Sequence, residues 1–203
     1  MSAIYIVEGV AGSGKDTLTT QLLAWLRPDE RHVQAFPEEA VLASWLHYFV
    51  PNIHESRLDL THRLVEHVER TLEREPDTVF VFNRFHVSHA VWRAEMQAST
   101  ELEQRHTALV ARLSKLPTLV LHTVVEPSDA EARTSHLERR EVAWRRFLAR
   151  RLETHAQTSP GASYLEQQDA MTRIIERDAL PYRRINLGAG VPVDIGAIVE
   201  DDS

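Results

Sequence analysis

The chain of 203 residues contains no cysteine, which excludes disulfide bonds and thiolate metal sites. It also lacks an apolar run of transmembrane length and a signal-like start, which together predict a cytoplasmic protein without membrane association. A net charge of −7 disfavours a nucleic-acid partner, although a local basic groove stays open. Glycine is scarce, with seven residues, yet three of them fall between Gly9 and Gly14. The small glycine supply is therefore concentrated at one place near the start of the chain.

The pattern of apolar residues predicts a single α/β domain spanning residues 1–203. Short apolar runs favour strands at 4–7, 78–82 and 118–125, and further strands are expected at 32–36 and 182–186. Helices are expected at 16–26, 39–49, 57–75, 88–97, 100–114, 128–157 and 165–178 and after Pro192, with a loop at 158–163. This alternation is typical of a parallel sheet of about five strands with helices on both faces.

The clustered glycines belong to the segment GVAGSGKDT, residues 9–17, which separates the first predicted strand from the first predicted helix. A strand, G-x-x-x-x-G-K and a helix in this order form the pattern of a phosphate-binding loop. Glycines allow backbone N–H groups to surround an anion, and the positive end of the helix points at the same place. The lysine adds a mobile charge for the β- and γ-phosphate oxygens. The predicted nucleotide-binding residues are Gly9, Gly12, Ser13, Gly14, Lys15, Asp16 and Thr17.

Asp16 is unusual, because such loops usually carry a Ser or Thr for magnesium directly after the lysine. An inward carboxylate would repel a triphosphate, so we interpret Asp16 as an acidic residue that favours the helix dipole. Thr17 then becomes the hydroxyl closest to the metal, and adenylate kinases are similar in having a non-hydroxyl residue followed by Thr. The loop is therefore still predicted to bind phosphate, with Thr17 as the metal-binding residue.

Segments downstream of the loop supply further charged and aromatic residues. FPEEAVL, residues 36–42, follows the second predicted strand, and Arg63 lies on the next long helix. The strand VFVF then leads into Asn83-Arg84-Phe85, with Ser88 four residues after Arg84. These segments resemble those of thymidylate kinases, a family that has a Phe-Pro-Glu-Arg or Arg-Glu-Pro-Gly segment, a helical Arg, and a strand ending in Asp-Arg-Tyr/Phe with a Ser at the same offset. Residues 117–140 and 180–186 resemble its arginine-bearing lid region and its last strand.

This resemblance implies a P-loop kinase with a small helical lid at about residues 128–145. It implies transfer of the γ-phosphoryl group of ATP to a nucleotide-type acceptor, with Mg²⁺ arriving together with ATP, and it leaves a homodimer open. Arg133 would contact the nucleotide, while Arg139 and Arg140 would reach the transferring phosphoryl group. The implied acceptor-binding residues are Phe36, Glu38, Arg63, Arg84, Phe85, Ser88 and Trp92.

Three residues depart from the family pattern in the acceptor region. Glu39 replaces an arginine expected near the acceptor phosphate, Asn83 replaces an aspartate that helps to organise magnesium, and Asp59 replaces a frequent aromatic residue. A glutamate in place of a phosphate-binding arginine exchanges attraction for repulsion. These departures argue against a simple thymidylate acceptor and leave kinase chemistry intact.

Deoxynucleoside kinases offer an alternative, because they share this fold and keep a glutamate after the second strand that accepts the proton of the attacking hydroxyl. Glu38 or Glu39 could act as that base beside Arg84. A sugar-phosphate acceptor and a nucleotide-binding protein without turnover also stay open. A guanine-nucleotide switch is disfavoured, because the sequence has no Asn-Lys-x-Asp motif.

Overall fold

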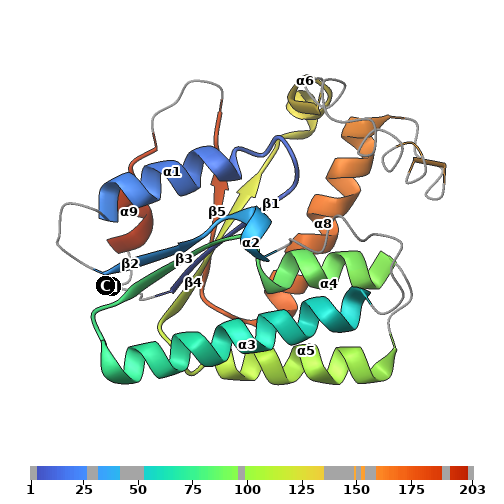
Figure 1. Cartoon of the computed structure of the whole chain (residues 1–203). Helices are drawn as coiled ribbons and strands as arrows, with labels where there is room; N and C mark the ends of the chain where they lie inside the picture. The colour runs from blue at the N-terminus through green and yellow to red at the C-terminus, as the bar shows by residue number, and fades with distance from the viewer. Residues whose placement is uncertain are drawn as a thin grey trace.

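The centre of the protein is a sheet of five parallel strands in the order β2-β3-β1-β4-β5 (Figure 1). The computed structural model describes residues 4–26, 32–41, 53–95, 99–134, 149, 152–153, 159–188 and 193–200. The strands are β1 (Ile4–Gly9), β2 (Val33–Phe36), β3 (Val79–Asn83), β4 (Thr118–Val124) and β5 (Tyr182–Asn186). This confirms the predicted α/β class, the five strands and their parallel arrangement.

Helices cover both faces of this sheet (Figure 1). On one face lie α1 (Lys15–Leu26) and α9 (Ile195–Glu200). On the other lie α3 (Ile53–Arg74), α4 (His86–Glu95), α5 (Thr100–Leu113) and α8 (Pro160–Asp178). The short elements α2 (Glu38–Val41), η3 (Pro127–Asp129) and α6 (Ala130–Thr134) follow the carboxyl ends of β2 and β4.

Residues of the central strand alternate between two hydrophobic cores. Ile4 and Ile6 of β1 join the core under α3, α4, α5 and α8, whereas Tyr5 and Val7 join the core under α1 and α9. Successive side chains of a strand point to opposite faces, so a strand buried on both faces appears in the sequence as a continuous apolar run. This is why β1, β3 and β4, which are buried along their whole length, were predictable from short apolar runs.

The carboxyl ends of the strands carry the loops of interest. The chain leaves β1 toward β2 on one side of the sheet and later returns to β4 on the other side. In an open parallel sheet, the crevice at such a switch point is where ligands bind. The glycine-rich segment follows β1 directly, so the fold puts it at this crevice.

Two of the predicted helix boundaries need correction. The predicted loop at 158–163 is wrong from Pro160 onward, because α8 begins there with Ser159 as its N-cap and Pro160 in the first turn. The Ser159 hydroxyl accepts a hydrogen bond from the backbone N–H of Ala162 at 3.2 Å, which is a normal helix start for a Ser-Pro pair. In addition, α3 begins at Ile53, four residues before the prediction.

Parts of two other predicted helices lie outside the described residues. Of the helix expected at 39–49, the described part is α2, which ends at Val41. Of the region 128–157, the described start is the 3₁₀ turn η3 followed by α6, and most of the remainder is not described. None of the described helices has the length and apolar composition that crossing a bilayer requires.

Candidate functional site

The loop after β1 has the backbone geometry of an anion-binding loop. Gly12 and Gly14 have φ values of 82° and 90°, in the left-handed region that favours glycine. A Cβ at Gly14 would lie 2.6 Å from a methyl carbon of Leu187, so a side chain here would have to displace that methyl group in addition to adopting the left-handed backbone. The Ser13 hydroxyl lies 2.8 Å from the carbonyl oxygen of Val10 and 2.6 Å from the hydroxyl of Thr123 in β4. The loop is therefore fixed both internally and to the neighbouring strand.

Lys15 begins α1, and its ammonium group is surrounded by carboxylates. Its side chain is 6% exposed, and Nζ lies 2.7 Å from Asp16 Oδ1 and 2.7 Å from Glu38 Oε2. Glu38 comes from α2, which follows β2, so two loops at the carboxyl edge of the sheet meet at this lysine. Two carboxylate oxygens, one from α1 and one from α2, therefore lie against the Lys15 ammonium group.

Glu38 joins Lys15 to Arg84. The same Oε2 atom that contacts Lys15 lies 3.1 Å from Arg84 Nε, and the Arg84 side chain is 7% exposed. Burial raises the pKa of the Glu38 carboxyl, but the positive charges of Arg84 and Lys15 outweigh this effect and hold the pKa below its usual value. Glu38 is therefore ionised at neutral pH and is held between two cations.

Asp16 has a more specific environment than the sequence suggested. Its Oδ1 accepts hydrogen bonds from Lys15 Nζ at 2.7 Å and from Asn83 Nδ2 at 2.8 Å. Partial burial raises the pKa of Asp16. The two hydrogen bonds and the nearby positive charges lower it by more than burial raises it, so the pKa lies below its usual value. Asp16 and Asn83, two of the unusual residues of the sequence, are thus direct partners across the site.

Arg84 stands at a sharp corner between β3 and α4. Its φ of 68° is unusual for a residue with a side chain, and its backbone N–H donates to the carbonyl oxygen of Val7 at 2.9 Å. Strained backbone of this kind is concentrated at functional sites. The Arg84 guanidinium also donates to the Ser88 hydroxyl at 3.2 Å, one turn into α4. The predicted pair Arg84 and Ser88 is therefore brought together.

Other predicted acceptor residues lie elsewhere. Glu39 and Arg63 are exposed, on α2 and α3 respectively, and the arginine that α3 buries is Arg57. The Phe36 ring stacks on Phe82 at a centroid distance of 4.7 Å. The Phe85 ring also packs against Phe82, at a centroid distance of 4.4 Å, and Phe85, like Ser88, has no exposed surface. The Trp92 side chain, Arg139 and Arg140 lie outside the described residues.

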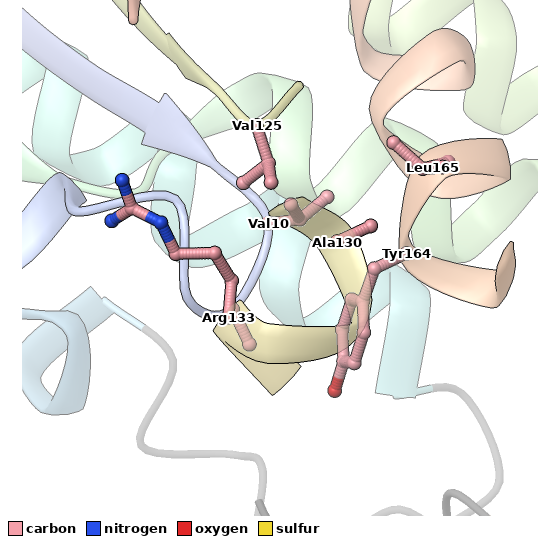
Figure 2. A pocket seen from close by; sticks show the side chains of 7 residues that line it. Val10, Val125, Ala130, Arg133, Tyr164 and Leu165 are labelled. Carbon is pink, nitrogen blue, oxygen red and sulfur yellow. The ribbon is translucent and has the colours of Figure 1, made fainter. Parts of the chain in front are cut away.

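Thr17 and Arg133 occupy the rim of the loop. Thr17 is exposed in the first turn of α1. Arg133 of α6 donates a hydrogen bond to the backbone carbonyl oxygen of Leu187, the residue packed against Gly14. Figure 2 shows Arg133 extending toward the loop after β1 and away from Tyr164 of α8. A small, mainly apolar pocket lies here, lined by Val10, Ala11, Val125, Ala130, Arg133, Tyr164 and Leu165.

Sequence reasoning missed two residues that support the site. Thr123 contacts Ser13 and donates to the carbonyl oxygen of Glu8 at 3.1 Å. The Glu8 side chain is fully buried and accepts hydrogen bonds from the first turn of α4. The sequence does contain a signal for Glu8. Glu8 lies two residues after Ile6 and four after Ile4, so a charged residue occupies the same face as these apolar residues of the strand. Thr123 gives no such signal, because threonine is common in strands.

Comparison with known proteins adds no assignment. No protein-family model matches the chain, and no curated protein matches it either. Within the described residues, no group of three or more His, Asp or Glu side chains could hold a metal ion by itself. The site must therefore be interpreted from its own geometry.

Proposed function

We propose that the chain is an ATP-dependent phosphotransferase of the P-loop kinase type, in which Glu38 activates a neutral hydroxyl acceptor. The observation that carries this proposal is the position of the Glu38 carboxylate, 2.7 Å from Lys15 Nζ and 3.1 Å from Arg84 Nε. A lysine at the start of a helix behind a glycine loop suits the phosphates of ATP. A carboxylate beside that lysine suits the hydroxyl that attacks them.

The loop residues fit a triphosphate. Gly12 and Gly14 provide left-handed backbone, and Lys15 already holds an anionic oxygen. Thr17 would hold the Mg²⁺ that arrives with ATP, and this ion would neutralise charge on the phosphate oxygens. Arg133, beside the loop, and the lid arginines Arg139 and Arg140 are the further cations proposed to contact the nucleotide and the transferring group.

The reaction assigns a role to each central residue. The acceptor hydroxyl gives its proton to Glu38, its oxygen bonds to the γ-phosphorus, and the bond from that phosphorus to the bridging oxygen of ADP breaks. Lys15 must leave Glu38 to contact the phosphates, so Glu38 then keeps only Arg84 as a direct cationic partner. Loss of one cation raises the pKa of Glu38 toward the range in which a general base works best.

A neutral acceptor is favoured over the nucleotide-type acceptor that the resemblance implies. The guanidinium of Arg84 is already paired with Glu38, and Arg63, the second cation expected for an acceptor phosphate, lies exposed on α3. The negative charge of an acceptor monophosphate would therefore be repelled by the Glu38 carboxylate, with neither of these two arginines unpaired beside it to compensate. A nucleoside or a similar small hydroxyl compound would avoid this repulsion.

The test compares two adjacent glutamates. Glu38→Gln should lower kcat by roughly 10²–10⁴-fold because it removes the base, whereas Glu39→Gln, which changes an exposed side chain, should change it little. The assay measures ADP formation with a panel of nucleosides and their matched monophosphates. Equal activity of Glu38→Gln and wild type would contradict Glu38 as base. Turnover of monophosphates alone would restore the nucleotide-type acceptor.

A further inference from the structure

The buried carboxylate of Glu8 has no role in the chemistry proposed above. Glu8 is the last residue of β1 before Gly9, and its side chain is 0% exposed. It continues the inward series of Ile4 and Ile6, so a carboxylate stands where an apolar side chain would be expected. Burial of a carboxylate is costly unless its oxygens are fully hydrogen-bonded. The hydrogen-bond partners of Glu8 therefore indicate the role of this buried carboxylate.

Glu8 of β1 contacts the start of α4, although α4 follows β3 along the chain. Its Oε1 accepts hydrogen bonds from the backbone N–H groups of Phe85 at 2.8 Å and Ser88 at 3.3 Å. These are among the N–H groups that have no partner within a helix. Its other oxygen, Oε2, accepts a hydrogen bond from the Ser88 hydroxyl. Three donors from one helical turn thus converge on a single carboxylate.

The Ser88 hydroxyl fixes the direction of the whole chain of hydrogen bonds. Arg84 Nη1 lies 3.2 Å from Ser88 Oγ, and a guanidinium can only donate. Ser88 accepts from Arg84, so its own proton is free to point at Glu8 Oε2. The hydrogen bonds therefore run from Arg84 to Ser88 and from Ser88 to Glu8, and both Glu8 oxygens act as acceptors.

Arg84 is thereby held to β1 at two points. Its backbone N–H donates to Val7, and its guanidinium reaches Glu8, the next residue of that strand, through Ser88. The Nε atom of the same guanidinium lies 3.1 Å from Glu38 Oε2. We infer that Glu8 is a positioning residue that fixes the Arg84 guanidinium against the Glu38 carboxylate through Ser88. This inference rests on the proposed function, in which Arg84 and Glu38 face the acceptor.

Helix capping alone does not require a carboxylate at this position. Burial raises the pKa of Glu8 above its usual value even though Ser88, Arg84 and the backbone donors act in the opposite direction. A serine or asparagine caps a helix without this penalty. What a neutral residue lacks is a second acceptor oxygen directed at Ser88 and a negative charge opposite Arg84.

The test uses two variants and two measurements. Glu8→Gln keeps the shape and one acceptor but turns an amide donor toward the Ser88 hydroxyl, and Ser88→Ala removes the link without changing any charge. The first measurement is the solvent exchange rate of the Arg84 Nε–H by NMR, with the signal identified by its loss in Arg84→Lys. The second measurement is kcat of each variant, together with its Kd for ATP, so that an effect on turnover can be separated from an effect on ATP binding.

Both variants should speed exchange of the Arg84 Nε–H by about tenfold or more. They should lower kcat by roughly 10- to 100-fold, the effect of misplacing a catalytic group by about 1 Å, with little change in the Kd for ATP. Leu109→Ala is the control, because it removes a fully buried side chain of α5 and should lower stability without changing Arg84 exchange.

Wild-type exchange and kcat in a folded Glu8→Gln protein would overturn the inference. If Glu8→Gln does not fold, Ser88→Ala decides by the same criterion. Absence of phosphoryl transfer in the wild type would overturn the proposed function, while the exchange measurement would still decide whether Glu8 holds Arg84, since it needs no turnover.

Discussion

At the scale of single residues, the site depends on a position, Gly9, at which even the one carbon atom that alanine would add collides with a neighbouring strand. A Cβ at Gly9 would lie 2.1 Å from the Thr123 hydroxyl and 2.7 Å from the Thr123 carbonyl oxygen. Real Cβ atoms do not approach so closely, and the carbonyl oxygen belongs to a central strand that cannot move freely. Gly9 therefore sets how closely the start of the loop approaches β4.

Gly9→Ala should destabilise the protein by about 3 kcal/mol, the upper end of typical overpacking effects, because strands β1 and β4 would have to separate. Gly196→Ala is a matched control in α9, where the nearest atom to a new Cβ would be 3.3 Å away. It should change stability by less than about 1 kcal/mol. Urea unfolding of the two variants measures the difference, and equal midpoints would show that the contact at Gly9 relaxes easily.

Residue-scale prediction from the sequence works best where a residue type has one local backbone role. Gly12 and Gly14 have the left-handed backbone expected of glycines in this loop, and Lys15 begins the helix that follows, whereas phosphate binding by the loop stays a prediction. The contacts of Glu8 and of Asp16 with Asn83 were not predictable, because they join segments about 70 residues or more apart. Nothing in the sequence near either partner specifies such a contact.

At the scale of elements, the face that a helix turns inward decides which residues reach the site. The buried residues of α3 include Arg57, Thr61, Val65 and Val68, at helical spacing. Arg63 lies six residues after Arg57, roughly 240° around the axis, so it falls on another face. The resemblance implied an acceptor role for Arg63 from its position along the chain, but this position does not fix which face of a helix a residue occupies.

The carboxyl end of α8 is attached to α5 through a buried carboxylate. The Asp178 side chain is 4% exposed, and its Oδ2 lies 2.9 Å from His106 Nε2. Burial raises the pKa of Asp178, but the hydrogen bond from His106 and neighbouring positive charges lower it below the usual value. The pKa in the folded state is therefore below that of the unfolded chain.

Asp178→Asn should lower the free energy of unfolding by about 1–3 kcal/mol at neutral pH. Because the folded-state pKa is depressed, the contribution is complete above the unfolded pKa and disappears as the pH falls through the folded one. The difference in the free energy of unfolding between wild type and Asp178→Asn should thus become smaller as the pH falls. Asp169→Asn, an exposed position of the same helix, should have little effect. A gap that widens in acid would contradict this account of Asp178.

At the scale of the whole molecule, the sheet gathers side chains from distant segments at one edge. Lys15 follows β1, Glu38 follows β2, and Arg84 follows β3. Their strands are neighbours in the order β2-β3-β1, so the groups meet although the sequence separates them by tens of residues. The fold class was predictable from apolar runs. The apolar runs do not encode the strand order that brings these three groups together, and the expectation that Glu38 lies beside Arg84 came from the family resemblance.

The most direct test of the central claim is transfer of a labelled γ-phosphoryl group from ATP, with Mg²⁺, to matched nucleosides and nucleoside monophosphates. The proposed function predicts a labelled product from a neutral hydroxyl acceptor, none with Lys15→Ala, and normal product with Lys115→Ala, which changes an exposed lysine. Undiminished transfer by Lys15→Ala, or no transfer by the wild type to any acceptor, would contradict it.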